Sequence, residues 1–140
     1  MTGSSQRDDM LAEIIRIAEL LLADGEHKAA VAHCTAALRA RGDRPDLRVF
    51  RARGLLAMRR LDEAERDLAL ALRLRPESAT IHRLLCEAAL CRGDLAAAEI
   101  LLDRALDLDP SHPRARELAQ VALGWRAECT ALRYGAGRAA

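Results

Sequence analysis

The sequence predicts an all-α protein, an α-solenoid of three helix-turn-helix repeats with a capping helix at its carboxyl end. Three observations predict this fold: a helix-forming composition, a period of 34 residues, and turn-forming residues inside each repeat. The 140 residues include 29 Ala and 24 Leu but only 3 Val and 5 Ile, with one each of Phe, Trp and Tyr. Because strands favour β-branched and aromatic residues, a sheet sandwich or barrel is disfavoured.

The 34-residue period is carried by columns of small residues, and such self-similarity is typical of repeat architectures. The columns are Ala18, Ala52 and Cys86; Ala30, Ala64 and Ala98; and Ala37, Ala71 and Ala105. Two helices approach each other closely only where side chains are short, so the columns predict buried helix crossings. They divide the chain into units 11–44, 45–78 and 79–112 without insertions.

Each unit is predicted to hold two helices. In the third unit, apolar residues recur at helical spacing on both sides of Gly93-Asp94, and Asp109-Pro110 ends the second helix. Gly93 suits a helix exit, and Asp94 can cap the helix that follows. Pro45 and Ser78 lie where a first-turn proline and an N-cap are expected.

These residues resemble the tetratricopeptide repeat family over residues 11–112. The third unit matches the family pattern best, whereas the first has Gly42 where the family usually has proline. The second unit departs most, with Arg48 and Arg51 at positions where the family prefers apolar residues. The resemblance implies six antiparallel helices in three pairs, followed by a solvating helix.

The expected domain covers residues 9–133, and its last part, 113–133, is the solvating helix. Leu118, Val121, Ala122, Trp125 and Leu132 lie roughly on one face of that helix, and Trp125 is expected to anchor it on the third unit. Residues 1–8 are expected to be disordered, and residues 134–140 to form a flexible tail.

Arg51 is a problem for the family register, which would point its side chain between the two helices of its own unit. A bare guanidinium there is costly unless it finds a carboxylate or water. We therefore expect this helix to be rotated, with Phe50 inside and Arg51 leaning outward. Arg48, Arg51 and Arg53 would then form a basic patch, which is either a site for an acidic partner segment or a set of surface ion pairs.

The first helix of each unit lines the groove in the family, and this implies a partner-binding surface. The residues carried over by the resemblance, here called the groove residues, are Ile15, Glu19, Asp46, Val49, Arg53, Thr80, Arg83 and Glu87. Leu22, Leu56 and Leu90 lie nearby and belong either to this floor or to the core. Relatives that hold a terminal carboxylate use Lys and Asn at the positions of Ile15 and Glu19, so that ligand is disfavoured.

No pattern of known catalytic chemistry is present, so the sequence predicts no enzyme, no cofactor and no metal site. The chain has no Walker loop, GxGxxG, HExxH or GxSxG motif. His82 and Cys86 share a helix face, but a metal needs three or four ligands that converge. Packing is therefore the preferred interpretation of Cys86, because a free cysteine behaves as a small apolar residue.

Charge and cysteine usage narrow the class of partner. The formal net charge is +1, from 22 basic and 21 acidic residues, and 21 of the bases are Arg. Neither nucleic acid nor an anionic membrane is indicated. Four cysteines without CxxC spacing suit reduced thiols, and no signal peptide is visible, so a cytoplasmic and, from the Arg- and Ala-rich composition, bacterial protein is expected.

The main functional hypothesis is a non-catalytic interaction module that binds a peptide or protein segment in the groove. One alternative is a self-assembling repeat protein that forms a dimer or filament through its repeat ends. Another is a chaperone similar to those of type III secretion, which share this length and layout.

Overall fold

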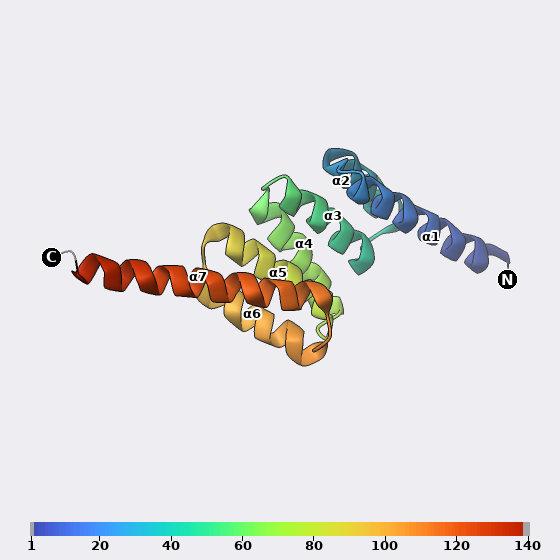
Figure 1. The fold of residues 1–140 in the computed structure, drawn as a ribbon. Coiled ribbons are helices and arrows are strands. Elements are labelled where there is room, and N and C mark those ends of the chain that lie inside the picture. Colours follow the sequence, from blue (N-terminus) through green and yellow to red (C-terminus); the bar gives the residue numbers. More distant parts are fainter. Residues whose placement is uncertain (1, 139–140) are drawn as a thin grey trace. The chain divides into compact units, whose positions relative to one another are not determined.

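The structure is a computed structural model that describes the backbone of residues 2–138 and the side chains of residues 3–125. This part of the chain contains helices and no strand (Figure 1). The helices are α1 (Thr2–Ala23), α2 (His27–Arg41), α3 (Pro45–Ala57), α4 (Leu61–Leu74), α5 (Ala79–Arg92), α6 (Leu95–Leu108) and α7 (Pro113–Arg138). The predicted all-α fold of helical pairs is confirmed.

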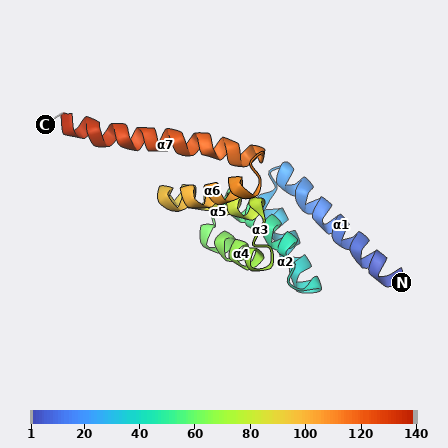
Figure 2. The same ribbon diagram turned by 90° about the horizontal axis from the view of Figure 1, so that it is seen from below.

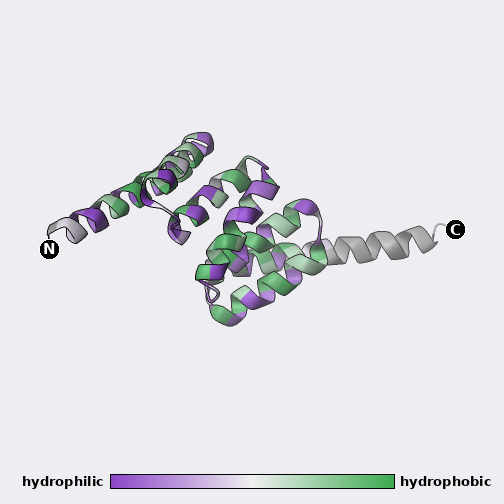
Figure 3. Cartoon of the chain, turned by 180° about the vertical axis from the view of Figure 1, so that it is seen from behind, coloured by the Kyte–Doolittle hydropathy of each residue, from purple (hydrophilic) through white to green (hydrophobic). Residues whose placement is uncertain are grey.

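The chain divides into two compact units. Unit 1 spans Met1–Glu77 and holds α1 to α4, and unit 2 spans Ser78–Ala140 and holds α5 to α7. Within unit 1, α3 packs against α1, α2 and α4, and within unit 2, α7 packs against α5 and α6. Hydrophobic and hydrophilic stretches alternate along these helices, as expected when each buries one face (Figure 3).

Two of the predicted helix caps are confirmed. The Ser78 hydroxyl accepts a hydrogen bond from the Ile81 amide at 3.3 Å, and an Asp94 carboxylate oxygen accepts one from the Ala97 amide at 3.1 Å. Each bond satisfies an amide that has no partner within its own helix. Pro45 begins α3, where its fixed φ fits the first helical turn.

The turn inside each pair of helices uses a left-handed residue at the same repeat position. Gly25 and Gly93 have φ of 77° and 76°, and Arg59, which is 34 residues from each, has φ of 61°. The left-handed region is favourable for glycine but crowded for a residue that has a Cβ. The second repeat therefore keeps the backbone turn of the other two without the glycine that suits it.

The small columns lie at the centre of each unit, as predicted. Ala18, Ala30, Ala52 and Ala64 are fully buried in unit 1, and Cys86 and Ala98 are fully buried in unit 2. In unit 1 a glycine on α3 brings α2 still closer. A Cβ on Gly54 would lie 2.8 Å from Cγ2 of Val31.

The first part of α7 completes the core of unit 2. Ala115, Leu118 and Ala122 are buried against a cluster that includes Cys86 and Ala98. Their spacing of three and four residues places them on one face of the helix. This segment therefore covers the apolar edge of the α5–α6 pair, as expected of a solvating helix.

The expected anchoring by Trp125 is wrong, because its side chain is 39% exposed and Val121, one turn earlier, is exposed as well. Helix α6 has 14 residues, which is about 21 Å of helix, whereas α7 has 26. Both ribbon views show α7 continuing beyond the ends of α5 and α6 (Figures 1 and 2). Among the described side chains of α7, Ala122 is the last one that is buried, and Trp125 comes three residues after it.

Both end segments are helical where the structure describes them, and the disorder expected of residues 1–8 and 134–140 stays a prediction. Residues 2–8 form the first turns of α1, and α7 continues to Arg138, past the expected end at residue 133. The segment 2–8 contains no proline, and extending a helix that is already nucleated adds one hydrogen bond per residue. Residues 139–140 of the expected tail lie outside the described residues.

Candidate functional site

In unit 1 the groove residues lie on α1 and α3, which pack against each other. On α1, Ile15 is half-buried and Glu19 is exposed. On α3, Asp46 and Val49 are half-buried and Arg53 is exposed. Their spacing of three and four residues keeps the α3 group on one face of the helix. Two neighbouring helices thus offer partly buried aliphatic side chains between charges of both signs.

Two of these side chains have partners within unit 1. Asp46 accepts a hydrogen bond from Arg75 at 2.6 Å, which ties the start of α3 to the end of α4. The Arg53 guanidinium lies 5.5 Å from the centre of the Phe50 ring, within reach of a cation–π contact. The half-buried Phe50 ring therefore lies under the Arg53 guanidinium and does not take the inner position expected for it.

In unit 2 the groove residues lie on α5, beside the first turn of α7. Arg83 and Glu87 form an ion pair at 3.3 Å, and Glu87 also pairs with Arg114 of α7 at 3.0 Å. Thr80 lies one turn before Arg83 and is half-buried. Arg114 was missed in the sequence, because only the return of α7 along α5 brings it next to Glu87.

The column of Leu22, Leu56 and Leu90 was expected to belong either to the groove floor or to the core, and its members differ in burial. Leu56 and Leu90 are buried and belong to the cores of their units. Leu22 is only half-buried. The groove residues are divided between units 1 and 2, and their joint action as one groove stays a prediction.

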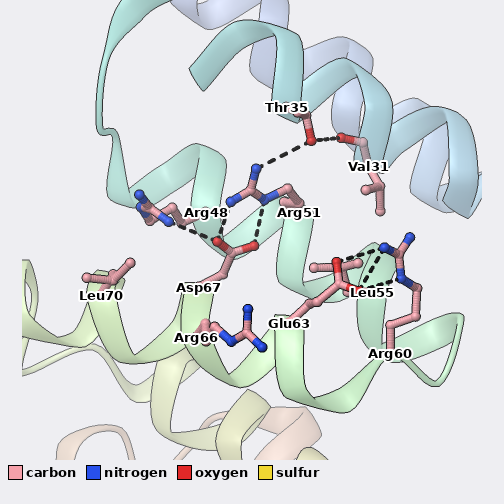
Figure 4. A pocket seen from close by; sticks show the side chains of 10 residues that line it. All are labelled: Val31, Thr35, Arg48, Arg51, Leu55, Arg60, Glu63, Arg66, Asp67 and Leu70. Carbon is pink, nitrogen blue, oxygen red and sulfur yellow. Dashed lines mark hydrogen bonds and ion pairs between the residues drawn. The ribbon is translucent and has the colours of Figure 1, made fainter. Parts of the chain in front are cut away.

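Arg51 occupies the inner position of α3, so the expected rotation of this helix is wrong. Its Nε and Nη2 atoms donate to the two carboxylate oxygens of Asp67 at 2.7 and 2.6 Å, and Nη1 donates to Thr35 at 3.4 Å (Figure 4). Asp67, on α4, is 2% exposed. A two-point pair of this kind supplies the partner that a guanidinium needs when it leaves water.

Arg48 adds a second guanidinium to the same carboxylate. Its Nη1 atom donates to Asp67 at 3.0 Å, and its Nε atom donates to the half-exposed Asp43. The hydrogen bonds that Arg51 donates to Asp67 raise the pKa of Arg51 above its ordinary value. The expected patch of Arg48, Arg51 and Arg53 does not form, because the first two point toward α4 and Arg53 lies on another face of α3.

The Arg51–Asp67 pair lines a cavity of about 440 Å³ between α2, α3 and α4 (Figure 4). The lining combines four arginines and two carboxylates with aliphatic side chains. The lining residues are Val31, Thr35, Arg48, Arg51, Leu55, Arg60, Glu63, Arg66, Asp67 and Leu70. None of them was a predicted groove residue.

The buried cysteines have the environment of packing residues. Burial raises the pKa of Cys34 and of Cys86 to about 11, so both thiols are protonated at neutral pH. The neighbour of Cys86, His82, uses its Nδ1 atom to donate to the Ser78 carbonyl at 2.9 Å. Among the described side chains, no three His, Cys, Asp or Glu residues gather as metal ligands would. No described helix is both long and apolar enough to cross a membrane.

The sequence profile of the tetratricopeptide repeat family matches residues 51–113, which include parts of both units. Residues 51–113 carry tetratricopeptide repeats. The match begins at Arg51 and covers most of the second repeat and all of the third. No curated protein matches the chain.

Solved tetratricopeptide repeat domains share this α-solenoid fold. The first such domain of human RPAP3 has a TM-score of 0.74 at 20% identity, with 82% of this chain and 91% of that chain covered. The second domain of human RPAP3, solved in complex with the HSP70 peptide SGPTIEEVD, has a TM-score of 0.67 at 21% identity and coverages of 76% and 89%. The type III secretion translocator chaperone SycD of Yersinia enterocolitica has a TM-score of 0.72 at 18% identity and coverages of 91% and 88%.

Proposed function

We propose that this chain is a non-catalytic interaction module of the bacterial cytoplasm that binds a peptide or protein segment along the first helices of its repeats. The binding surface is formed by the groove residues on α1, α3 and α5. Binding requires neither a cofactor nor a metal, and the partner is neither nucleic acid nor a membrane.

The observation that carries this proposal is the pair of neighbouring helices α1 and α3. Ile15 and Val49 offer partly buried aliphatic surface, while Glu19 and Arg53 stand exposed with opposite charges. Aliphatic contacts supply affinity, and opposite charges favour one register of a bound segment. The peptide in the human RPAP3 complex supports the view that this fold can bind a peptide.

The terminal carboxylate of a chaperone is disfavoured as the ligand. In relatives that bind it, the positions of Ile15 and Glu19 carry Lys and Asn. An exposed Glu19 would repel a carboxylate rather than hold it. The proposed segment is therefore one with aliphatic side chains and charges complementary to Glu19 and Arg53.

The test is to reverse these two charges and measure what copurifies with the protein. Partners captured by the native chain are identified, and their affinities are measured for Glu19→Arg and Arg53→Glu. Arg104→Glu is the control, because Arg104 is an exposed arginine of α6 outside the groove residues. We expect both groove variants to weaken a partner that the control retains. Equal affinity in all variants would refute the proposal.

Self-association is a second candidate, favoured by the exposed apolar side chains of α7. Val121, Leu123 and Trp125 are exposed, and a second copy would remove them from water. Light scattering should then give a mass that falls to that of a monomer in Trp125→Glu. A native chain that stays monomeric across concentrations would exclude this candidate. A secretion-chaperone role is a narrower form of the groove proposal and is supported by the likeness to SycD in fold alone.

A further inference from the structure

The cavity in unit 1 has the size of a ligand pocket. Its volume of about 440 Å³ lies within the range of small-molecule and side-chain binding sites, and it is open on one side to solvent. Val31 of α2, Leu55 of α3 and Leu70 of α4 contribute aliphatic lining. The arginines and the two carboxylates supply its polar lining (Figure 4).

This cavity lies on a different face of α3 from the groove residues. Successive residues of a helix are turned by about 100°, so Arg51 and Leu55 share one face while Val49 and Arg53 lie on the far side. Contacts agree with this geometry, since Arg51 reaches Asp67 of α4 and Arg53 covers Phe50. A ligand in the cavity would therefore leave the groove residues uncovered.

The charge of the cavity is unbalanced in favour of cations. Four arginines line it with only two carboxylates, and Asp43, outside the lining, adds one more acidic partner for Arg48. Arg60 pairs with Glu63 at the rim through bonds of 2.9 and 2.8 Å. Arg66 has no ion-pair partner among the described side chains, and it is exposed.

The guanidinium groups also keep donors that their present partners do not use. A guanidinium has five N–H donors, and the bonds of Arg51 to Asp67 and Thr35 occupy three of them. Arg51 is held in place by Asp67, so an incoming acceptor would meet donors whose positions are already fixed. This lowers the side-chain entropy that binding would otherwise cost.

We propose that this cavity binds an acidic segment of a protein partner, with a carboxylate at Arg66 and Arg51 and its aliphatic stem against Leu55 and Leu70. A singly charged carboxylate fits the modest excess of cations. A phosphate carries about 1.5 to 2 negative charges at neutral pH and would meet stronger repulsion from Glu63 and Asp67. The site is separate from the groove of the proposed function and does not depend on it.

The test measures binding of a fluorescein-labelled peptide of alternating glutamate and leucine, amidated at its carboxyl end, by fluorescence anisotropy. We expect saturable binding that is lost when glutamine replaces glutamate in the peptide. Arg66→Glu should weaken binding about fivefold or more, because an attraction becomes a repulsion. Amide chemical shifts of the native chain should change within α2, α3 and α4, around the lining residues.

Matched variants separate this site from others. Arg104→Glu makes the same charge change on α6, so it should bind the peptide within about twofold of the native chain. Arg53→Glu shows whether any of the peptide binds on the groove side of α3. Circular dichroism checks that Arg66→Glu stays folded, as expected for an exposed side chain without a partner.

Three results would overturn the proposal. The first is the absence of saturable binding, and the second is equal binding by the native chain and Arg66→Glu. The third is a loss in Arg53→Glu as large as in Arg66→Glu, which would place the peptide on the groove face. Inorganic phosphate that competes more strongly than acetate would assign the cavity to phosphate groups and refute the choice of a carboxylate.

Discussion

Arg51 shows how a charged side chain is accommodated between the helices of a repeat. Its guanidinium lies in a position that normally holds an apolar side chain, and Asp67 supplies a two-point partner from the next helix. Arg48 binds the same carboxylate, so three charged groups share one partly buried site. The stability of this site depends on Asp67, which is the most buried member.

Replacing Asp67 with Asn keeps the size of the side chain and removes its charge. We expect a loss of about 2 kcal/mol in the free energy of unfolding, below the value for a fully buried pair because both arginines are partly exposed. Chemical denaturation followed by circular dichroism measures this loss. Asp43→Asn is the matched control, since it removes a half-exposed carboxylate from Arg48 and should cost less than about 1 kcal/mol.

Arg59 stores backbone strain that a single substitution can release. Because the equivalent positions in the other repeats are Gly25 and Gly93, Arg59→Gly should raise the free energy of unfolding by up to about 1 kcal/mol. The reverse change, Gly93→Ala, meets no atom within 4 Å, so its expected loss comes from the backbone alone. Thermal unfolding of both variants measures these opposite shifts, and shifts of the same sign would contradict the assignment of strain.

At the level of the helices, the distance between neighbouring helical pairs depends on residues with very small side chains. Gly54 permits α2 and α3 to approach because its missing Cβ would overlap Val31. Gly124 of α7 has nothing within 4 Å of such a Cβ. Gly54 therefore has no room for a side chain, whereas Gly124 has room for one.

Substituting alanine at these two glycines separates packing from helix propensity. Gly54→Ala should destabilise by about 1–3 kcal/mol, less the gain of up to about 1 kcal/mol that alanine brings to a helix. Gly124→Ala should bring that gain without the overlap. Denaturation midpoints of both variants test this expectation, which fails if Gly54→Ala is as stable as Gly124→Ala.

Helix α7 is expected to report its partial exposure through Trp125, the only tryptophan. Since the Trp125 side chain is 39% exposed, its emission maximum should lie closer to that of tryptophan in water than the maximum of a fully buried ring does, and should shift only modestly on unfolding. Fluorescence spectra in buffer and in denaturant measure this. A strongly blue-shifted maximum in a monomer would contradict the exposed position, whereas a shift that depends on concentration would favour self-association.

For the molecule as a whole, net charge and surface composition set which partners can be attracted at long range. The near balance of 22 basic and 21 acidic residues creates no extended positive field. A repeat protein of this kind selects partners through local surfaces. We therefore expect specificity to come from particular side chains, such as Arg53 in the proposed groove and Arg66 in the proposed cavity site.

We expect no binding of labelled duplex DNA at physiological salt, because the chain cannot replace many counterions along a phosphate backbone. Anisotropy titrations at low and physiological salt test this. A steep salt dependence with appreciable affinity would contradict it. The acidic peptide used for the cavity is a suitable parallel sample, since its binding is expected to depend on Arg66 in the same buffer.

The sequence predicted the parts of the fold that depend on local pattern. The columns of Ala64 and Ala98, the cap at Asp94 and the pairing of helices follow from spacing along the chain. The Arg51–Asp67 pair did not, because no local pattern shows which carboxylate a neighbouring helix brings to an arginine 16 residues away.

The prediction that Trp125 is buried was wrong because it rested only on the row of apolar residues along one face of α7. Trp125 continues the stripe of Leu118 and Ala122, but the stripe says nothing of where the partner helices end. The helices that carry the groove residues were predictable, whereas their action as a binding surface stays a prediction. The link from Glu87 to Arg114 depends on how α7 packs and was not predictable.

Helix α3 has only 13 residues and carries side chains of both proposed sites, the groove residues on one face and the arginine-lined cavity on another. Thermodynamic linkage makes any coupling across this helix reciprocal, so each occupant would change the affinity of the other by the same factor. If α3 stays unchanged when one site is occupied, the affinity of the other site does not change. If α3 shifts or stiffens, that affinity rises or falls. The response of this one short helix would thereby decide whether two partners bind independently or influence each other's binding.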